Sequence, residues 1–127
     1  MNKTKNLHLI TSIILIIGVG LSYGINPSKI IPETLNINID TINLSNVFRA
    51  IMGLYLAMAF YWIIGVKKAE YWKGATVSVV IFMGGLAFGR TLSLVLDGIP
   101  HFNMIIGLIV EFIFMAWGIY NLKKYTD

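Results

Sequence analysis

Three ionisable side chains, Arg49, Arg90 and Glu111, fall inside segments that are otherwise apolar enough to lie in a membrane. An ionisable side chain inside a membrane span costs about 2.5 to 3.5 kcal/mol on insertion scales, so each one calls for a partner or a purpose. Counted at about 1.5 Å per residue from the nearer helix ends, the three lie roughly 6, 9 and 13 Å below one membrane surface. Two arginines and a carboxylate at these depths could hold an anionic headgroup, exchange a proton, or neutralise one another.

Each of these charges belongs to a stripe of polar and small residues, because positions three, four and seven apart share a helix face. The stripes are Ser45, Arg49 and Gly53; Arg90, Ser93 and Asp97; and Gly107, Glu111 and Gly118. Small residues let helices approach closely, and Gly85 and Gly89 supply a GxxxG pattern just before Arg90. We predict that the stripes turn inward and gather Arg49, Arg90, Ser93, Asp97 and Glu111 into one polar cluster.

The residues of this polar cluster are compatible with more than one function. It is structural if two cations and two anions cancel and fix which helices are neighbours. It is a binding site if the arginines hold an anionic amphiphile or a partner helix, and a small proton-coupled transporter is the alternative if Glu111 takes up protons. Catalysis is less favoured, because the sequence shows no Ser-His-Asp pattern, phosphate-binding loop or other nucleophile to name a reaction.

The remaining chemistry-bearing residues predict no cofactor or metal. The chain has no cysteine, which excludes disulfides, thiol catalysis and thiolate-bound metals. His8 and His101 fall at opposite ends of the expected bundle, so they cannot jointly bind a metal or haem. We interpret both as ordinary interfacial histidines.

The elements that must position these residues are membrane helices. At 127 residues, 57% hydrophobic and only 13% charged, with a mean hydropathy of +0.76, the chain has more apolar surface than a soluble domain of this size buries. Hydropathy predicts an all-α, four-helix transmembrane bundle as a single domain over residues 1–127, with helices at about 7–24, 45–66, 74–96 and 102–122. Residues 25–44 form an external loop, which is either a short amphipathic helix or an extended segment.

The distribution of lysine predicts the orientation of the bundle. One side carries Lys3, Lys5, Lys67, Lys68, Lys73, Lys123 and Lys124, and the other side carries Lys29. The positive-inside rule therefore places both termini in the cytoplasm. The net charge of +4 lies beside apolar spans, so we expect it to meet anionic lipid headgroups and not nucleic acid.

The segments that carry the predicted cluster also resemble a known family. Residues 48–55, FRAIMGLY, and residues 82–93, FMGGLAFGRTLS, followed by Asp97-Gly98-Ile99-Pro100 and by Glu111, are similar to the bacterial membrane family catalogued as domain of unknown function 4345. The Tyr23-Gly24-Ile25-Asn26-Pro27 segment fits as well. The resemblance covers nearly the whole chain and implies a four-helix membrane domain, but it implies no activity. We therefore expect a multi-pass protein of a bacterial cytoplasmic membrane, with lipids, a small amphiphile or another membrane protein as partners. The sequence predicts no particular oligomeric state.

Overall fold

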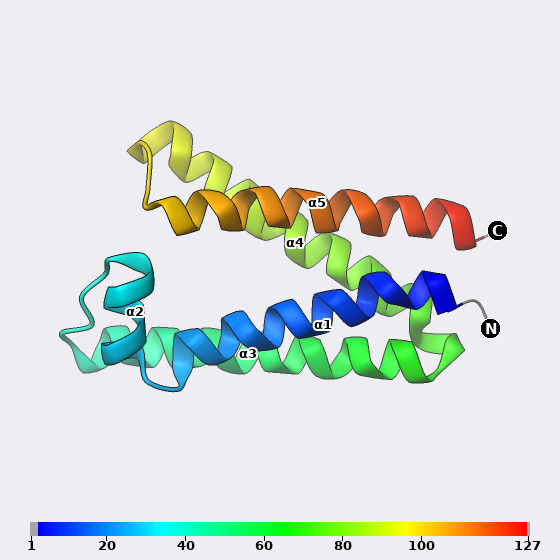
Figure 1. The fold of residues 1–127 in the computed structure, drawn as a ribbon, viewed down its shortest axis with the longest axis horizontal. Helices are drawn as coiled ribbons and strands as arrows, with labels where there is room; N and C mark the ends of the chain where they lie inside the picture. Colours follow the sequence, from blue (N-terminus) through cyan, green and yellow to red (C-terminus); the bar gives the residue numbers. More distant parts are fainter. Residues whose placement is uncertain (1–2, 127) are drawn as a thin grey trace.

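The computed structural model describes residues 3–126, which are helical except for short turns and caps. Five helices follow one another along the chain (Figure 1): α1 (Lys3–Gly24), α2 (Pro27–Leu35), α3 (Ile42–Lys67), α4 (Ala69–Asp97) and α5 (Phe102–Tyr125). All except α2 are long and apolar enough to cross a membrane. The prediction of an all-α bundle with four membrane spans is therefore confirmed.

The four long helices form two antiparallel pairs. Helix α1 packs along α3, while α4 crosses behind and packs along α5 (Figure 1). The start of α1, the end of α5 and the α3–α4 turn lie at one end of the bundle, which we call the terminal end. The α4–α5 turn and α2 lie at the other, which we call the α2 end. Helices α1 and α5 approach each other at the terminal end and diverge toward the α2 end.

The tightest packing lies toward the terminal end. Leu9, Trp62 and Val79, from three different helices, are fully buried there and belong to one apolar core. The indole Nε1 of Trp62 donates to the Ser78 hydroxyl at 2.9 Å, so the polar atom of this large ring is satisfied inside the core. Gly65 allows α3 to approach Ala75 of α4 so closely that a methyl group on Gly65 would overlap the Ala75 methyl. This half of the bundle is thus held by close side-chain packing.

Polar contacts also tie α1 to its neighbours at the terminal end. His8 is fully buried, and its Nε2 donates to the carbonyl oxygen of Phe114 at 3.0 Å, with Gly118 leaving room for the ring. The indole of Trp72 donates to the carbonyl oxygen of Lys5 at 3.3 Å. His8, which the sequence analysis interprets as an ordinary interfacial histidine, is therefore a buried residue that joins α1 to α5.

Every long helix extends past the segment that hydropathy predicts. Helix α3 begins at Ile42, three residues before the predicted start, because Thr41 is its N-cap and accepts from the Leu44 amide at 3.0 Å. Helix α4 begins at Ala69 and not near 74. Apolarity marks the part of a helix that lies in lipid, whereas backbone hydrogen bonding continues into polar residues beyond it.

The segment predicted as an external loop contains a helix. Pro27 occupies the first turn of α2, where its missing N–H has no helical partner to lose. Asn36 ends the helix in the left-handed conformation, at φ 58°, which asparagine tolerates better than most residues. Ile31 is fully buried beneath α2, so this short helix is anchored to the bundle.

Candidate functional site

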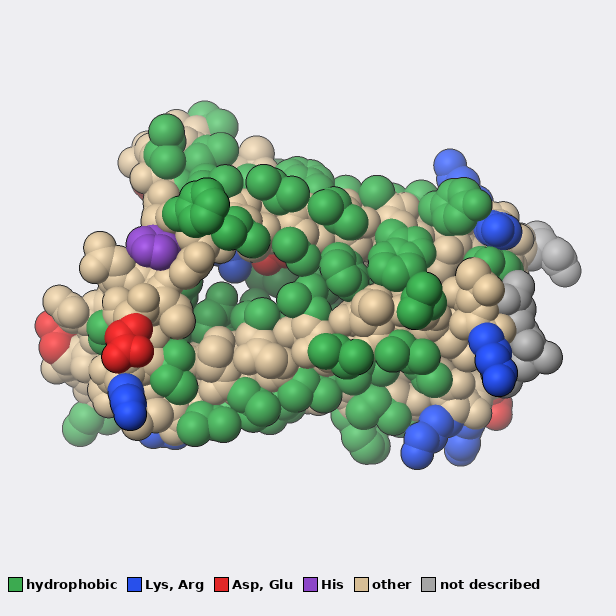
Figure 2. Space-filling view, viewed as in Figure 1, with side chains coloured by type: hydrophobic (Ala, Val, Ile, Leu, Met, Phe, Trp, Pro, Cys, Tyr) green, Lys and Arg blue, Asp and Glu red, His purple; other side chains and the backbone are tan. Residues whose placement is uncertain are grey.

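A cavity of about 290 Å³ lies between the diverging helices at the α2 end. Its wall is mainly apolar, with a minority of polar side chains that come from α1, α2, α3, α4 and α5. The polar ones are Ser22, Tyr23, Thr34, Tyr55, Arg90, Asn103 and Glu111. Figure 2 shows a hollow between α5 and α1, with basic and acidic side chains visible inside it. Arg90 and Glu111 are the basic and acidic residues among those that line the cavity.

Arg90 of α4 and Glu111 of α5 form the one ion pair found among residues 3–126. The Arg90 Nε donates to both carboxylate oxygens at 3.0 Å, and the side chains are 27% and 9% exposed, respectively. This geometry is not the parallel fork in which Nε and an Nη each take one oxygen. The Nη1 and Nη2 groups, which carry the remaining N–H donors, stay outside the contact with Glu111.

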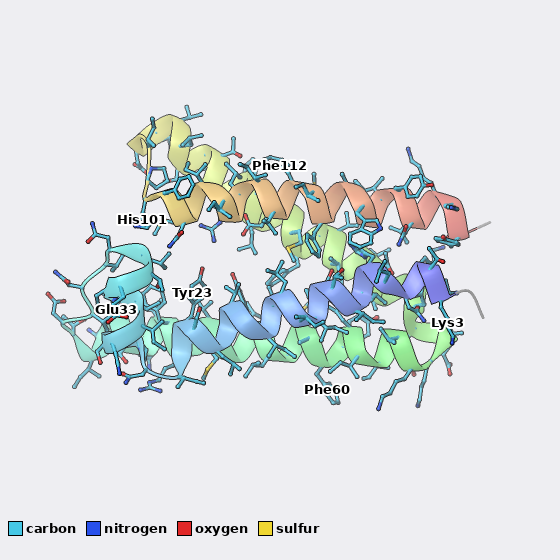
Figure 3. The ribbon with its side chains drawn as sticks, viewed as in Figure 1. Lys3, Tyr23, Glu33, Phe60, His101 and Phe112 are labelled. Carbon is cyan, nitrogen blue, oxygen red and sulfur yellow. The ribbon has the colours of Figure 1, made fainter. Side chains whose placement is uncertain are left out.

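The neighbours of the ion pair determine where the guanidinium lies. A Cβ built on Gly107, one helical turn before Glu111, would lie 3.7 Å from Arg90 Cζ, so the guanidinium rests against the bare backbone of α5 there. From the opposite side, Tyr23 of α1 points into the space between α1 and α5 (Figure 3) and interacts with Arg90. Arg90 is therefore held between two helices that belong to different pairs.

Arg49 does not join this ion pair, so the prediction that it meets Glu111 is wrong. Its Nη1 donates to the carbonyl oxygens of Gly24 at 2.8 Å and Ile25 at 3.4 Å. These carbonyls belong to the C-terminal end of α1, where the last turn of a helix lacks N–H partners and carries partial negative charge. Arg49 is thus a capping group that fastens α3 to the end of α1.

Ser93 and Asp97 also lie outside the ion pair. The Ser93 hydroxyl donates to Asp97 Oδ2 at 2.8 Å on the exposed last turns of α4. Ser93 and Arg90 both line a second, smaller cavity of about 80 Å³ next to the α4–α5 turn. Gly85 and Gly89 face away from the bundle, and an added Cβ on either would meet no atom within 4 Å among the described residues. Of the five predicted residues, the structure brings only Arg90 and Glu111 into one cluster.

Several residues of the site were not found by sequence reasoning. Asn103 Nδ2 donates to the carbonyl oxygen of Thr34 at 2.6 Å, which ties the start of α5 to the end of α2. Thr34 and Leu35 line the cavity, so α2 covers its outer end. The available signal was Asn103 itself, an amide in the first turn of an apolar span. Tyr23 and Tyr55 carried no such signal, because tyrosines near membrane surfaces are common.

Four membrane-spanning helices around a partly polar cavity define a multi-pass membrane bundle. Residues 4–122 match the family described as domain of unknown function (DUF4345), and the chain belongs to that family. No curated protein and no solved structure matches the chain.

Proposed function

We propose that this protein is a membrane-embedded binding protein that holds the anionic group of an amphiphile against Arg90. The observation that carries the proposal is the one-sided ion pair in the cavity wall. Glu111 engages the Nε of Arg90, and Tyr23 contacts the same guanidinium. Because the two Nη groups carry four N–H donors between them, donors remain for a further acceptor. A carboxylate or phosphate presents the paired oxygens that such donors recognise.

The size and lining of the cavity support an amphiphile. Protein interiors contain few voids larger than a water molecule, so a space of about 290 Å³ is not a packing defect. It corresponds to about ten waters at roughly 30 Å³ each. Side chains such as Leu15, Val19 and Leu86 present apolar surface, while Arg90 and Glu111 present charge. A ligand that satisfies both kinds of surface has an apolar part and an anionic part.

The packing of the bundle favours binding over the alternative of transport through Glu111. A transport path would have to continue from the cavity toward the terminal end. Leu9, Trp62 and Val79 fill the bundle in that direction and are fully buried. A site that is closed on that side fits retention of a ligand better than its passage.

The test is native mass spectrometry of the protein extracted gently from its own membrane, with tetradecyl phosphate added as a defined probe. We expect a discrete bound mass, native or added, on the wild type. The double variant Arg90→Leu/Glu111→Leu should lose it, because this variant removes the donors without leaving a buried charge unpaired. Asp97→Asn is the matched control, since it changes an exposed carboxylate on α4 outside the cavity. Equal bound mass on the double variant, or a bare wild type that takes up no probe, rejects the proposal.

We also propose that both termini face the cytoplasm of a bacterial inner membrane. The support is that the lysine-rich segments all lie at the terminal end, where Figure 2 shows most of the basic side chains of this view. Because the chain has no cysteine, a single introduced one is a unique label. We expect Lys68→Cys to be protected from a membrane-impermeant maleimide on intact cells, and Glu33→Cys in α2 to react. The reverse labelling pattern would show that the protein has the opposite topology.

A further inference from the structure

The mouth of the cavity points sideways and not along the bundle. In Figure 2 the hollow opens between α5 and α1, and the charged side chains are seen through it. The cavity lining includes Val19 of α1 and Val110 of α5, one from each of the two helices beside the hollow, and both are half-buried. Both helices are membrane spans. An opening between two spans at this depth faces lipid.

The polar contacts between α1 and α5 lie where the two helices are close together. The side-chain hydrogen bonds that join α1 to α5 lie at the terminal end, from His8 to the Phe114 carbonyl and from Asn121 to the Lys5 carbonyl at 3.5 Å. Toward the α2 end, the corresponding hydrogen bond among residues 3–126 joins α5 to α2, from Asn103 to the carbonyl oxygen of Thr34.

The direct route from the aqueous side is covered. Helix α2 lies over the outer end of the cavity, held below by the fully buried Ile31 and at its end by the hydrogen bond from Asn103 to Thr34. Access around α2 requires this bond to break and the helix to lift. Access between α1 and α5 requires neither.

We infer that the cavity is loaded sideways from the hydrocarbon layer, through a portal between Val19 and Val110. This inference rests on the proposed function and specifies the ligand class. The ligand is a membrane-resident amphiphile whose anionic headgroup occupies the cavity and whose chain stays in lipid. Glu111 lies nine residues into α5, about 13 Å below the start of that helix, so the headgroup must leave the membrane surface to reach Arg90.

One consequence separates this arrangement from a closed pocket. If the chain leaves through the portal, its length is not limited by the cavity, whereas the headgroup must fit within about 290 Å³. The site therefore selects among headgroups and is indifferent to chain length. A pocket that enclosed the whole ligand would instead reject long chains.

The first experiment tests the portal without any ligand. A nitroxide is attached at Val110→Cys in vesicles of phosphatidylcholine and phosphatidylglycerol, and its collisions with oxygen are compared with those with a water-soluble nickel chelate. Ile109→Cys is the matched control, because Ile109 is 55% exposed on the neighbouring lipid-facing position. We expect the nitroxide to collide more often with oxygen than with the nickel chelate, in the same ratio at both sites. More frequent collisions with nickel than with oxygen at Val110, or no collisions with either reagent, would overturn the portal.

The second experiment tests the ligand class in nanodiscs with decyl phosphate, tetradecyl phosphate or inorganic phosphate. We expect the two alkyl phosphates to reach equal occupancy at equal mole fraction in the bilayer, and inorganic phosphate to show none. Val110→Trp, which narrows the portal, should abolish binding, while Ile109→Trp should retain it. Occupancy that falls with chain length, or binding of inorganic phosphate, contradicts the inference. A lipid-facing nitroxide with no alkyl phosphate bound would refute the proposed function and leave the portal standing.

Discussion

Glu111→Leu is expected to destabilise the bundle by about 3 to 5 kcal/mol, the cost of removing one partner from a buried ion pair. Glu111 is the less exposed partner, at 9%, and both of its carboxylate oxygens accept from the Arg90 Nε. Without it, the guanidinium remains inside the membrane with no counter-charge. The measurement is the free energy of unfolding in mixed micelles, followed by the fluorescence of the three tryptophans.

The double variant Arg90→Leu/Glu111→Leu is the control that assigns this loss to the unpaired charge. Replacing both members of a buried pair by apolar residues is often neutral or stabilising. We therefore expect the double variant to recover most of the stability lost by Glu111→Leu. If the double variant is as unstable as the sum of the two single variants, the residues act independently and the ion pair has no energetic role.

Gly65→Ala is expected to give the second large effect, a loss of about 1 to 3 kcal/mol from overpacking. The new methyl group would overlap the methyl group of Ala75, and it would lie 3.3 Å from Leu9 Cδ1. The Ala75 methyl has no rotamer that moves it away, so α3 and α4 must separate to relieve the clash. The same unfolding measurement reports this change.

Gly53→Ala on the same helix is the matched control for Gly65→Ala. Nothing described lies within 4 Å of a Cβ at Gly53. The substitution there should be neutral, or stabilising by up to about 1 kcal/mol from helix propensity. Equal losses at both positions would show that the effect belongs to glycine itself and not to the α3–α4 contact.

These two predictions concern different halves of the bundle. The Gly65 contact belongs to the closely packed terminal end, where stability comes from helices in direct contact. The Arg90–Glu111 pair lies at the α2 end, where the helices diverge around a cavity that side-chain packing does not fill. The one ion pair found among the described residues therefore lies in the wall of that cavity, where the proposed function requires it.

Much of the fold could be predicted from the sequence. Hydropathy predicts four spans because each helix must present about 20 apolar residues to cross the hydrocarbon layer. Helical periodicity placed Gly107, Glu111 and Gly118 on one face, and the structure turns that face inward, toward Arg90 and His8. The depth of Arg90 and Glu111 follows from counting residues, so their pairing was within reach of the sequence.

Only the tertiary structure decided which helix faces meet. Arg49 and Arg90 have similar depth and similar stripes, yet Arg49 caps α1 while Arg90 pairs with Glu111. In a soluble protein, the polar face of each helix is exposed and the apolar face is buried, so the sequence predicts which face packs against the other helices. In a bilayer, the lipid-facing and the buried surfaces are both apolar, so hydropathy carries no signal for orientation about the helix axis. The sequence by itself therefore determined the spans and the depth of their charges, whereas packing between helices determined the cavity, its portal and the residues that line it.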